Sequence, residues 1–149
     1  MRVLYGVQGT GNGHLTRAIA MSETIKRSLS KCEVDVLISG RVEEKLPIKA
    51  RKIIWRKGAT FVVKNGEVQL LKTLFNFSPR KLIRDIRRLK IWEYDLLVTD
   101  YEPIVAWAGR IRRKEVIGIG HQYAFYYDIP IQGGETLIKK YHEAFCARH

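Results

Sequence analysis

Three glycines and a histidine follow the first apolar run of the sequence, as Gly9-Thr10-Gly11-Asn12-Gly13-His14. Glycines let a backbone approach a ligand, and a helix N-terminus offers free N–H groups and partial positive charge to an anion. The spacing matches neither the dinucleotide fingerprint nor a Walker loop, and Asp35 only loosely matches the acidic residue that a dinucleotide site needs. We therefore expect a ligand-binding loop without a nicotinamide or flavin cofactor; a tight turn without a ligand is the alternative.

His14 and Asp100 are the candidate catalytic pair. The positive end of a helix disfavours the imidazolium form, so His14 is expected to be neutral and able to act as a base. Such a base gains from a carboxylate that orients its second ring nitrogen, and Asp100 ends a strand expected at the same edge of a sheet. The alternatives are a capping or core role for His14 and an N-cap role for Asp100, before the helix that follows Pro103.

A third cluster of polar and aromatic residues begins at Gly120-His121-Gln122 and continues to Tyr127. Such mixtures of donors, acceptors and flat apolar faces bind sugars, although a hydrophobic cluster beneath a loop would look the same. The four histidines and two cysteines lack the spacing of metal ligands, so we expect no structural metal.

Hydrophobic periodicity predicts the elements that position these three loops. Strands are expected over residues 2–7, 33–38, 52–55, 95–99 and 116–119. Helices are expected from Asn12, as N-cap, to about Ser30, from Ser78-Pro79, from Glu102-Pro103, and over residues 135–147. The residues expected to face inward from the second and third of these helices are Leu82, Ile83, Ile86, Leu89, Ile104, Val105, Ala108 and Ile111.

The alternation of strands and helices predicts an α/β fold: a Rossmann-like, doubly wound parallel sheet in a single domain over residues 1–149. Asn65-Gly66 between β-rich runs predicts a β-hairpin inserted near residues 60–71. Ligands bind outside the carboxyl ends of the strands in such sheets, so the three loops should converge on one cleft.

The charge of the chain is concentrated in one segment. The net charge is +12, and residues 45–90 hold 14 basic side chains against two acidic ones, so the remainder is neutral. This basic segment favours an anionic partner such as a membrane surface or a phosphorylated substrate over a merely solvated face. No RNA-binding signature or recognition-helix motif accompanies it, which disfavours nucleic acid.

The run from Gly9 to Ala18 resembles the first β-α loop of GT-B glycosyltransferases. Together with Thr99-Asp100-Tyr101-Glu102-Pro103 and Gly120-His121-Gln122-Tyr123-Ala124-Phe125, it is similar in order to a little-characterised prokaryotic glycosyltransferase-like family. The bacterial GlcNAc transferase that forms lipid II is a more distant likeness. The resemblance spans about residues 1–134.

This resemblance implies two Rossmann-like domains with a cleft between them. The N-terminal domain would bind a sugar acceptor, often lipid-linked, and the C-terminal domain most of a nucleotide-diphosphate sugar donor. His14 and Asp100 match a histidine that deprotonates the acceptor and its assisting aspartate. Because the sequence stops at His149, the donor domain is expected to be absent, so that transfer would need a separate donor-domain chain or a homo-oligomer.

We therefore predict the acceptor-side domain of a glycosyltransferase, cytoplasmic and peripheral at the inner face of an anionic membrane. No apolar run is long enough to span a bilayer, and the start does not read as a signal peptide. A non-catalytic module that binds an anionic lipid, nucleic acid or a partner chain is the alternative. Besides His14 and Asp100, the predicted substrate-binding residues are Gly9, Thr10, Gly11, Asn12, Gly13, Arg17, Glu102, His121 and Gln122.

Overall fold

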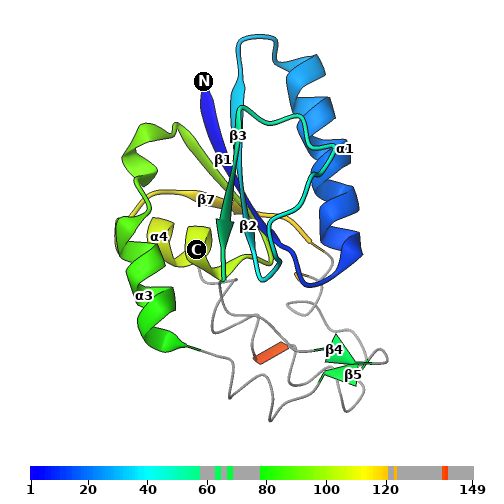
Figure 1. The fold of residues 1–149 in the computed structure, drawn as a ribbon. Helices are drawn as coiled ribbons and strands as arrows, with labels where there is room; N and C mark the ends of the chain where they lie inside the picture. The colour runs from blue at the N-terminus through cyan, green and yellow to red at the C-terminus, as the bar shows by residue number, and fades with distance from the viewer. Residues whose placement is uncertain (58–62, 65–66, 69–77, 121–122, 124–138, 141–149) are drawn as a thin grey trace.

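A five-stranded, all-parallel sheet organises the chain (Figure 1). The computed structural model describes residues 1–57, 63–64, 67–68, 78–120, 123 and 139–140. The strands run in the order β3-β2-β1-β6-β7. Their bounds are β1 Arg2–Gln8, β2 Glu33–Ser39, β3 Lys52–Arg56, β6 Leu96–Asp100 and β7 Val116–Gly118. The predicted doubly wound parallel sheet is confirmed, with strand ends displaced by only a residue or two.

Helices cover both faces of this sheet (Figure 1). Helix α1 (Asn12–Ser28) packs on one face, where Leu15 and Ala18 join the inward side chains of β1 and β2. Helices α3 (Pro79–Arg88) and α4 (Pro103–Ile111) pack on the other face, and a short 3₁₀ turn, η1 (Ile91–Glu93), precedes β6. None of the described helices is long and apolar enough to cross a membrane.

The predicted hairpin is present in shortened form. β4 (Val63–Lys64) pairs antiparallel with β5 (Glu67–Val68), so that Val63 lies opposite Val68. The Asn65-Gly66 turn, the flanks of the insertion and nearly all of the final helix expected over residues 135–147 lie outside the described residues.

Two expected helix details are wrong. The N-cap of α1 is Gly11 rather than Asn12, which is the first helical residue and caps nothing with its side chain. Ile83 and Ile111, expected in the core, are 48% and 60% exposed. They lie at the edges of the apolar stripes of α3 and α4, where the gap between the two helices leaves them in solvent.

The strand order places a topological switch point between β1 and β6. These strands are neighbours, with Val7 opposite Asp100, but β1 leads into α1 on one face and β6 into α4 on the other. The connections therefore diverge at the carboxyl edge of the sheet, which is where ligands bind in open α/β sheets. The glycine loop and the turn after Asp100 both lie at this point.

Candidate active site

His14 and Asp100 are in contact at the switch point between β1 and β6. His14 lies in the first turn of α1, and its Nδ1 is 2.7 Å from Oδ1 of Asp100, the last residue of β6. The Asp100 side chain is fully buried, whereas that of His14 is 14% exposed. The two predicted catalytic residues are thus one hydrogen-bonded unit; their catalytic role stays a prediction.

The charge of Asp100 determines which nitrogen of His14 carries the proton. Burial raises the pKa of the Asp100 carboxyl, but hydrogen bonds from His14 and Arg17 outweigh it and hold the pKa below its usual value. An ionised carboxylate only accepts hydrogen bonds, so Nδ1–H must donate. The lone pair of a neutral His14 is therefore on Nε2, which can accept a proton.

Arg17 completes the unit from the next turn of α1. Three residues after His14, it shares the same helix face. Its Nε donates to Asp100 Oδ2 at 2.6 Å and its Nη2 to Oδ1 at 2.8 Å, a two-point pairing that fixes the carboxylate plane. The side chain is 31% exposed. Arg17 thus holds Asp100 in place, while its predicted contact with substrate stays a prediction.

Two tyrosines that were not predicted as site residues also contact His14 or Asp100. The Tyr5 hydroxyl donates to Asp100 Oδ2 at 3.3 Å, and burial together with the Asp100 charge raises the phenol pKa. The Tyr101 ring lies parallel to the His14 imidazole, with centroids 5.8 Å apart. Tyr101 has a φ of 58°, a left-handed backbone conformation that residues other than glycine rarely adopt. Strand alternation could have indicated Tyr5, which faces α1 with Val3 and Val7.

The glycine loop is tied to the end of β2. Gly9 N–H donates to the Ser39 carbonyl at 2.7 Å, and a Cβ at Gly9 would lie 2.9 Å from that oxygen. Glycine is therefore required there by close packing. Arg41 donates to the Gly9 carbonyl at 3.4 Å and to Asn12 Oδ1 at 3.2 Å. The Asn12 side-chain oxygen, which was expected to cap α1, therefore accepts from Arg41.

The outer part of the same loop is open. A Cβ at Gly13 would meet nothing within 4 Å, and one at Gly11 only the edge of the His14 ring, at 3.9 Å. No side chain caps the first turn of α1. Thr10 Oγ1 is buried and has no hydrogen-bond partner in the described part of the chain. The first turn of α1 thus leaves backbone N–H groups beside His14 that a ligand could use.

Glu102 occupies a structural position. It is fully buried as the N-cap of α4, where Oε1 accepts from Ile104 N–H at 3.0 Å and Oε2 from Val105 N–H at 2.7 Å. The alternative that Asp100 caps this helix is therefore wrong. Both Glu102 oxygens are occupied, and its predicted contact with substrate stays a prediction.

Glu102 should make the stability of the chain depend on pH. Burial raises its pKa from 4.5 to about 7, although the two backbone hydrogen bonds oppose this. The folded chain therefore binds this proton more tightly than the unfolded chain, so stability should fall by about 3 kcal/mol as the pH rises from about 4.5 to 7. We expect Glu102→Gln to remove most of this fall in urea unfolding measured across that range.

The matched control is Glu115→Gln, because Glu115 is exposed. This variant should keep the wild-type pH profile. An equal fall in Glu102→Gln would show that other groups titrate in this window.

The third predicted cluster is only partly described. The chain leaves β7 beside the end of β6, since Ile119 N–H donates to the Thr99 carbonyl at 2.8 Å. The cluster therefore begins at the same sheet edge as His14. His121 and Gln122 lie outside the described residues, so their predicted contacts with sugar or phosphate stay a prediction.

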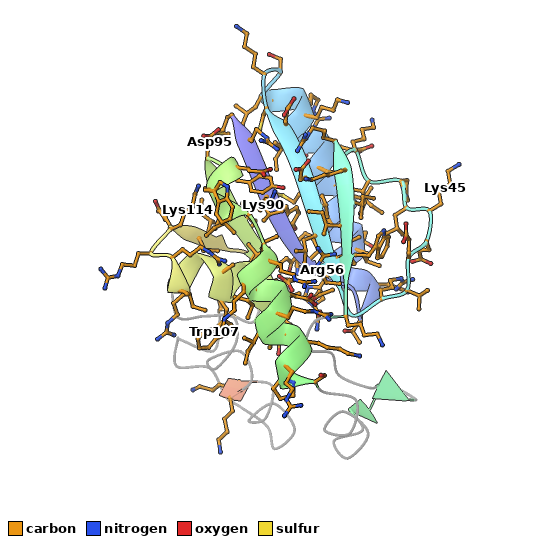
Figure 2. The ribbon with its side chains drawn as sticks, turned by 60° about the vertical axis from the view of Figure 1, so that its left-hand side comes forward. Lys45, Arg56, Lys90, Asp95, Trp107 and Lys114 are labelled. Atoms are coloured by element: carbon orange, nitrogen blue, oxygen red, sulfur yellow. The ribbon has the colours of Figure 1, made fainter. Side chains whose placement is uncertain are left out.

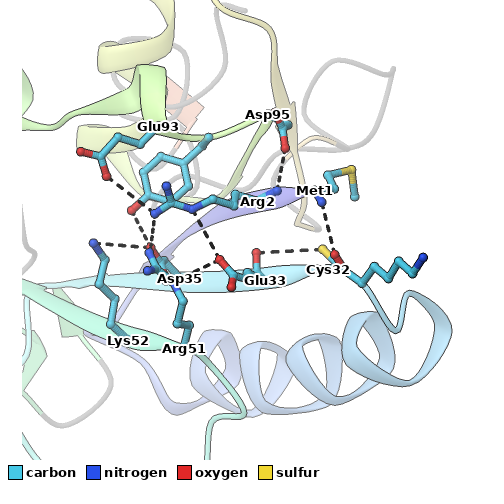
Figure 3. Close-up of polar contacts among 11 residues, drawn as sticks. Met1, Arg2, Cys32, Glu33, Asp35, Arg51, Lys52, Glu93 and Asp95 are labelled. Atoms are coloured by element: carbon cyan, nitrogen blue, oxygen red, sulfur yellow. Dashed lines mark hydrogen bonds and ion pairs between the residues drawn. The ribbon is translucent and has the colours of Figure 1, made fainter.

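Asp35 lies away from this edge. It is the third residue of β2, and its buried carboxylate accepts from Arg51 Nε at 2.9 Å and from the Tyr94 hydroxyl at 2.7 Å (Figure 3). The carboxyl end of β2 instead carries Ser39-Gly40-Arg41. None of these three residues carries the carboxylate that a dinucleotide ribose needs. Among the described residues, no three His, Cys, Asp or Glu side chains gather as a metal site requires.

Comparison with known proteins identifies the family. The sequence profile described as Glycosyl transferase family 1 matches residues 1–139. Among solved structures, MurG of Acinetobacter baumannii matches at 18% identity and a TM-score of 0.45, over 78% of this chain and 34% of that one. The chain thus spans about a third of the length of that protein. No curated protein matches. Because the family profile covers nearly all of it, the chain belongs to glycosyl transferase family 1.

Proposed function

We propose that this chain is the acceptor side of a glycosyltransferase that moves a sugar from a nucleotide-diphosphate sugar to a hydroxyl group of a sugar or lipid-linked acceptor. The observation that carries the proposal is the His14–Asp100 unit at the switch point between β1 and β6. Family membership supplies the general reaction, glycosyl transfer, and this unit supplies a base where an acceptor would lie.

The proposed step is deprotonation of the acceptor as it attacks. Nε2 of His14 takes the hydroxyl proton while the acceptor oxygen bonds to the anomeric carbon of the donor. The bond from that carbon to the diphosphate breaks, and the nucleotide diphosphate leaves with the electron pair. Asp100 stabilises the resulting imidazolium through Nδ1–H, and Arg17 keeps the carboxylate oriented.

The donor would be held mainly by a second domain, by a separate donor-domain chain or by another copy of this chain. The test is transfer of labelled sugar from a panel of nucleotide sugars to lipid-phosphate acceptors. The chain is assayed alone and together with a donor-binding part. Transfer that requires both parts supports the proposal. Acceptor binding without transfer in any combination would favour a non-catalytic binding module.

The face formed by α3 and α4 suits contact with an anionic membrane. An apolar groove of about 560 Å³ lies between the helices, and its rim includes the exposed side chains of Ile83 and Ile111. Trp107, which also lines it, is half-buried (Figure 2). A row of arginines on α3 runs beside it: Arg80, Arg84, Arg87 and Arg88. Basic side chains attract anionic lipid headgroups, and apolar ones insert beneath them.

We expect the chain to pellet with anionic vesicles at low salt and to be released by about 0.5 M salt, where the Debye length is only a few ångströms. Neutral vesicles should bind poorly. Replacing Arg84, Arg87 and Arg88 with Glu should abolish pelleting, because each basic residue near the surface contributes about 1 kcal/mol.

The matched control replaces Lys26, Arg27 and Lys31, which are exposed near the end of α1, on the other side of the sheet. This control should still pellet. Equal binding to neutral and anionic vesicles, or loss in both triple variants, would contradict a specific membrane face.

A further inference from the structure

A second hollow lies on the other flank of α3, between this helix and the end of β3. It has a volume of about 410 Å³ and is lined by Trp55, Arg56, Lys57, Lys81, Arg84, Asp85 and Arg88. Among the described residues, five cationic side chains surround it, against one carboxylate. A concave site with this charge balance concentrates anions more strongly than a flat basic surface does.

The single carboxylate organises the hollow rather than neutralising it. The Asp85 side chain is only 12% exposed, and its Oδ1 lies 4.0 Å from Nε of Arg56 and 3.8 Å from Nε of Arg84. This largely covered carboxylate therefore lies within ion-pair distance of guanidinium groups from two elements, β3 and α3. Arg56 is also held by a hydrogen bond from Nη1 to the Trp55 carbonyl, at 2.8 Å. The hollow thus brings guanidinium groups of β3 and α3 to the same carboxylate.

The remaining cations have no partner of opposite charge among the residues that the structure describes. Lys57, Lys81 and Arg88 are exposed, and within the described residues none of them forms a salt bridge. Lys81, Arg84 and Arg88 follow i, i+3, i+7 spacing and form a strip on one face of α3 roughly 10 Å long. A single phosphate would cover only part of such a strip, whereas a linear run of phosphoryl groups would contact most of it.

The hollow is separate from the candidate active site. Arg56 lies opposite Ser39 in the sheet, and Ser39 lies opposite Gln8, so the end of β3 is two strands away from the end of β1. At roughly 5 Å per strand, about 10 Å separates them along the carboxyl edge. His14, Asp100 and the glycine loop contribute nothing to the lining.

We propose that this hollow, formed by Arg56, Lys57, Lys81, Arg84 and Arg88, is a binding site for a ligand with two or three phosphoryl groups in a row. Arginine pairs with phosphoryl oxygens through two parallel hydrogen bonds, and lysine contributes a point charge. The site does not depend on glycosyl transfer. Its ligand is either a free oligophosphate or the headgroup of a phosphorylated lipid.

Titration of the full chain with inorganic tripolyphosphate, followed by isothermal calorimetry and by backbone amide shifts, tests the site. We expect saturable binding, with the largest shifts in residues 55–57 and 81–88. Lys57→Gln with Lys81→Gln should weaken it at least about tenfold, since two charge-assisted contacts are lost. Both side chains are exposed, so this double variant should remain folded.

Arg80→Gln with Arg87→Gln is the matched control, because it removes two charges from the same helix outside this hollow. It should change the affinity less than about threefold. A second arm uses neutral vesicles with and without a lipid that carries a diphosphate headgroup. A lipid headgroup is the source if the chain binds these vesicles but not tripolyphosphate, and if only the Lys57/Lys81 variant loses the vesicle binding. Equal losses in both variants, or binding in neither arm, would overturn the site.

Discussion

His14→Ala should lower glycosyl transfer at least about 100-fold in an enzyme that includes the donor-binding part, because a general base contributes about 10²- to 10⁴-fold. The acceptor hydroxyl would then have to lose its proton to water. Folding should suffer much less. Asp100 keeps its bonds from Arg17 and Tyr5, so we expect a loss of about 1–2 kcal/mol. Single-turnover rates and urea unfolding measure the two effects.

Two further variants separate the base from its surroundings. His14→Gln can donate to Asp100 but cannot take a proton, so activity should remain low. Thr16→Ala, in the same turn of α1, removes only a hydroxyl that bonds to the Asn12 carbonyl, and turnover should be unchanged. Normal transfer by His14→Gln would remove His14 as the base.

The fold and the contact between His14 and Asp100 could be predicted from the sequence for a physical reason. Strands buried on both faces appear as continuous apolar runs, and β6, fully buried from Leu97 to Asp100, is such a run. Parallel strands bring their carboxyl ends to one edge, so a residue that ends one strand lies near the loop that follows another. Alternation of strand and helix was sufficient to predict this neighbourhood.

The residues that complete the site depend on contacts between distant segments. Arg41 donates to the Asn12 side-chain oxygen from 29 positions away. A capping rule considers only neighbouring residues and cannot predict this bond. The two-point pairing of Arg17 depends on the register that sets Asp100 opposite Val7. Tyr101 reaches the His14 ring through a left-handed backbone that sequence preferences disfavour. Each of these details requires the assembled sheet edge.

The same limit applies to the outer faces of α3 and α4. Helical spacing placed Ile83 and Ile111 in the core, but spacing alone cannot tell how closely two helices approach. Leu82 and Ile86 reach the sheet and are buried, whereas Ile83 lies one residue further around the helix and stays 48% exposed. The groove that results is the basis of the proposed membrane contact.

Asp100→Asn should cause a large loss of both activity and stability. The amide no longer accepts at both atoms, so it cannot fix Nδ1–H of His14 and pair with Arg17 together. We expect turnover to fall by about 10²- to 10⁴-fold. Breaking a buried ion pair costs about 3–5 kcal/mol, and the 31% exposure of Arg17 should reduce the loss to about 2–3 kcal/mol.

The chain contains a matched control for this variant. Asp35 is also buried, also accepts two bonds from an arginine and one from a tyrosine hydroxyl, and lies away from the site (Figure 3). Asp35→Asn should therefore lose similar stability and keep normal turnover, measured where both variants are folded. Equal loss of turnover in the two variants would mean that Asp100 acts only through stability.

The difference in stability between wild type and Asp100→Asn should depend on pH in acid. His14 and Arg17 hold the Asp100 pKa below 3.8 against the effect of burial. The stabilisation is therefore fully present above pH 3.8 and is lost as the pH falls through the folded-state pKa. The gap between wild type and Asp100→Asn should be constant above about pH 5 and should close in stronger acid. The Glu102 effect falls in the separate window from pH 4.5 to about 7, so a gap that changes there instead would mean that Asp100 is not the ionised partner of Arg17.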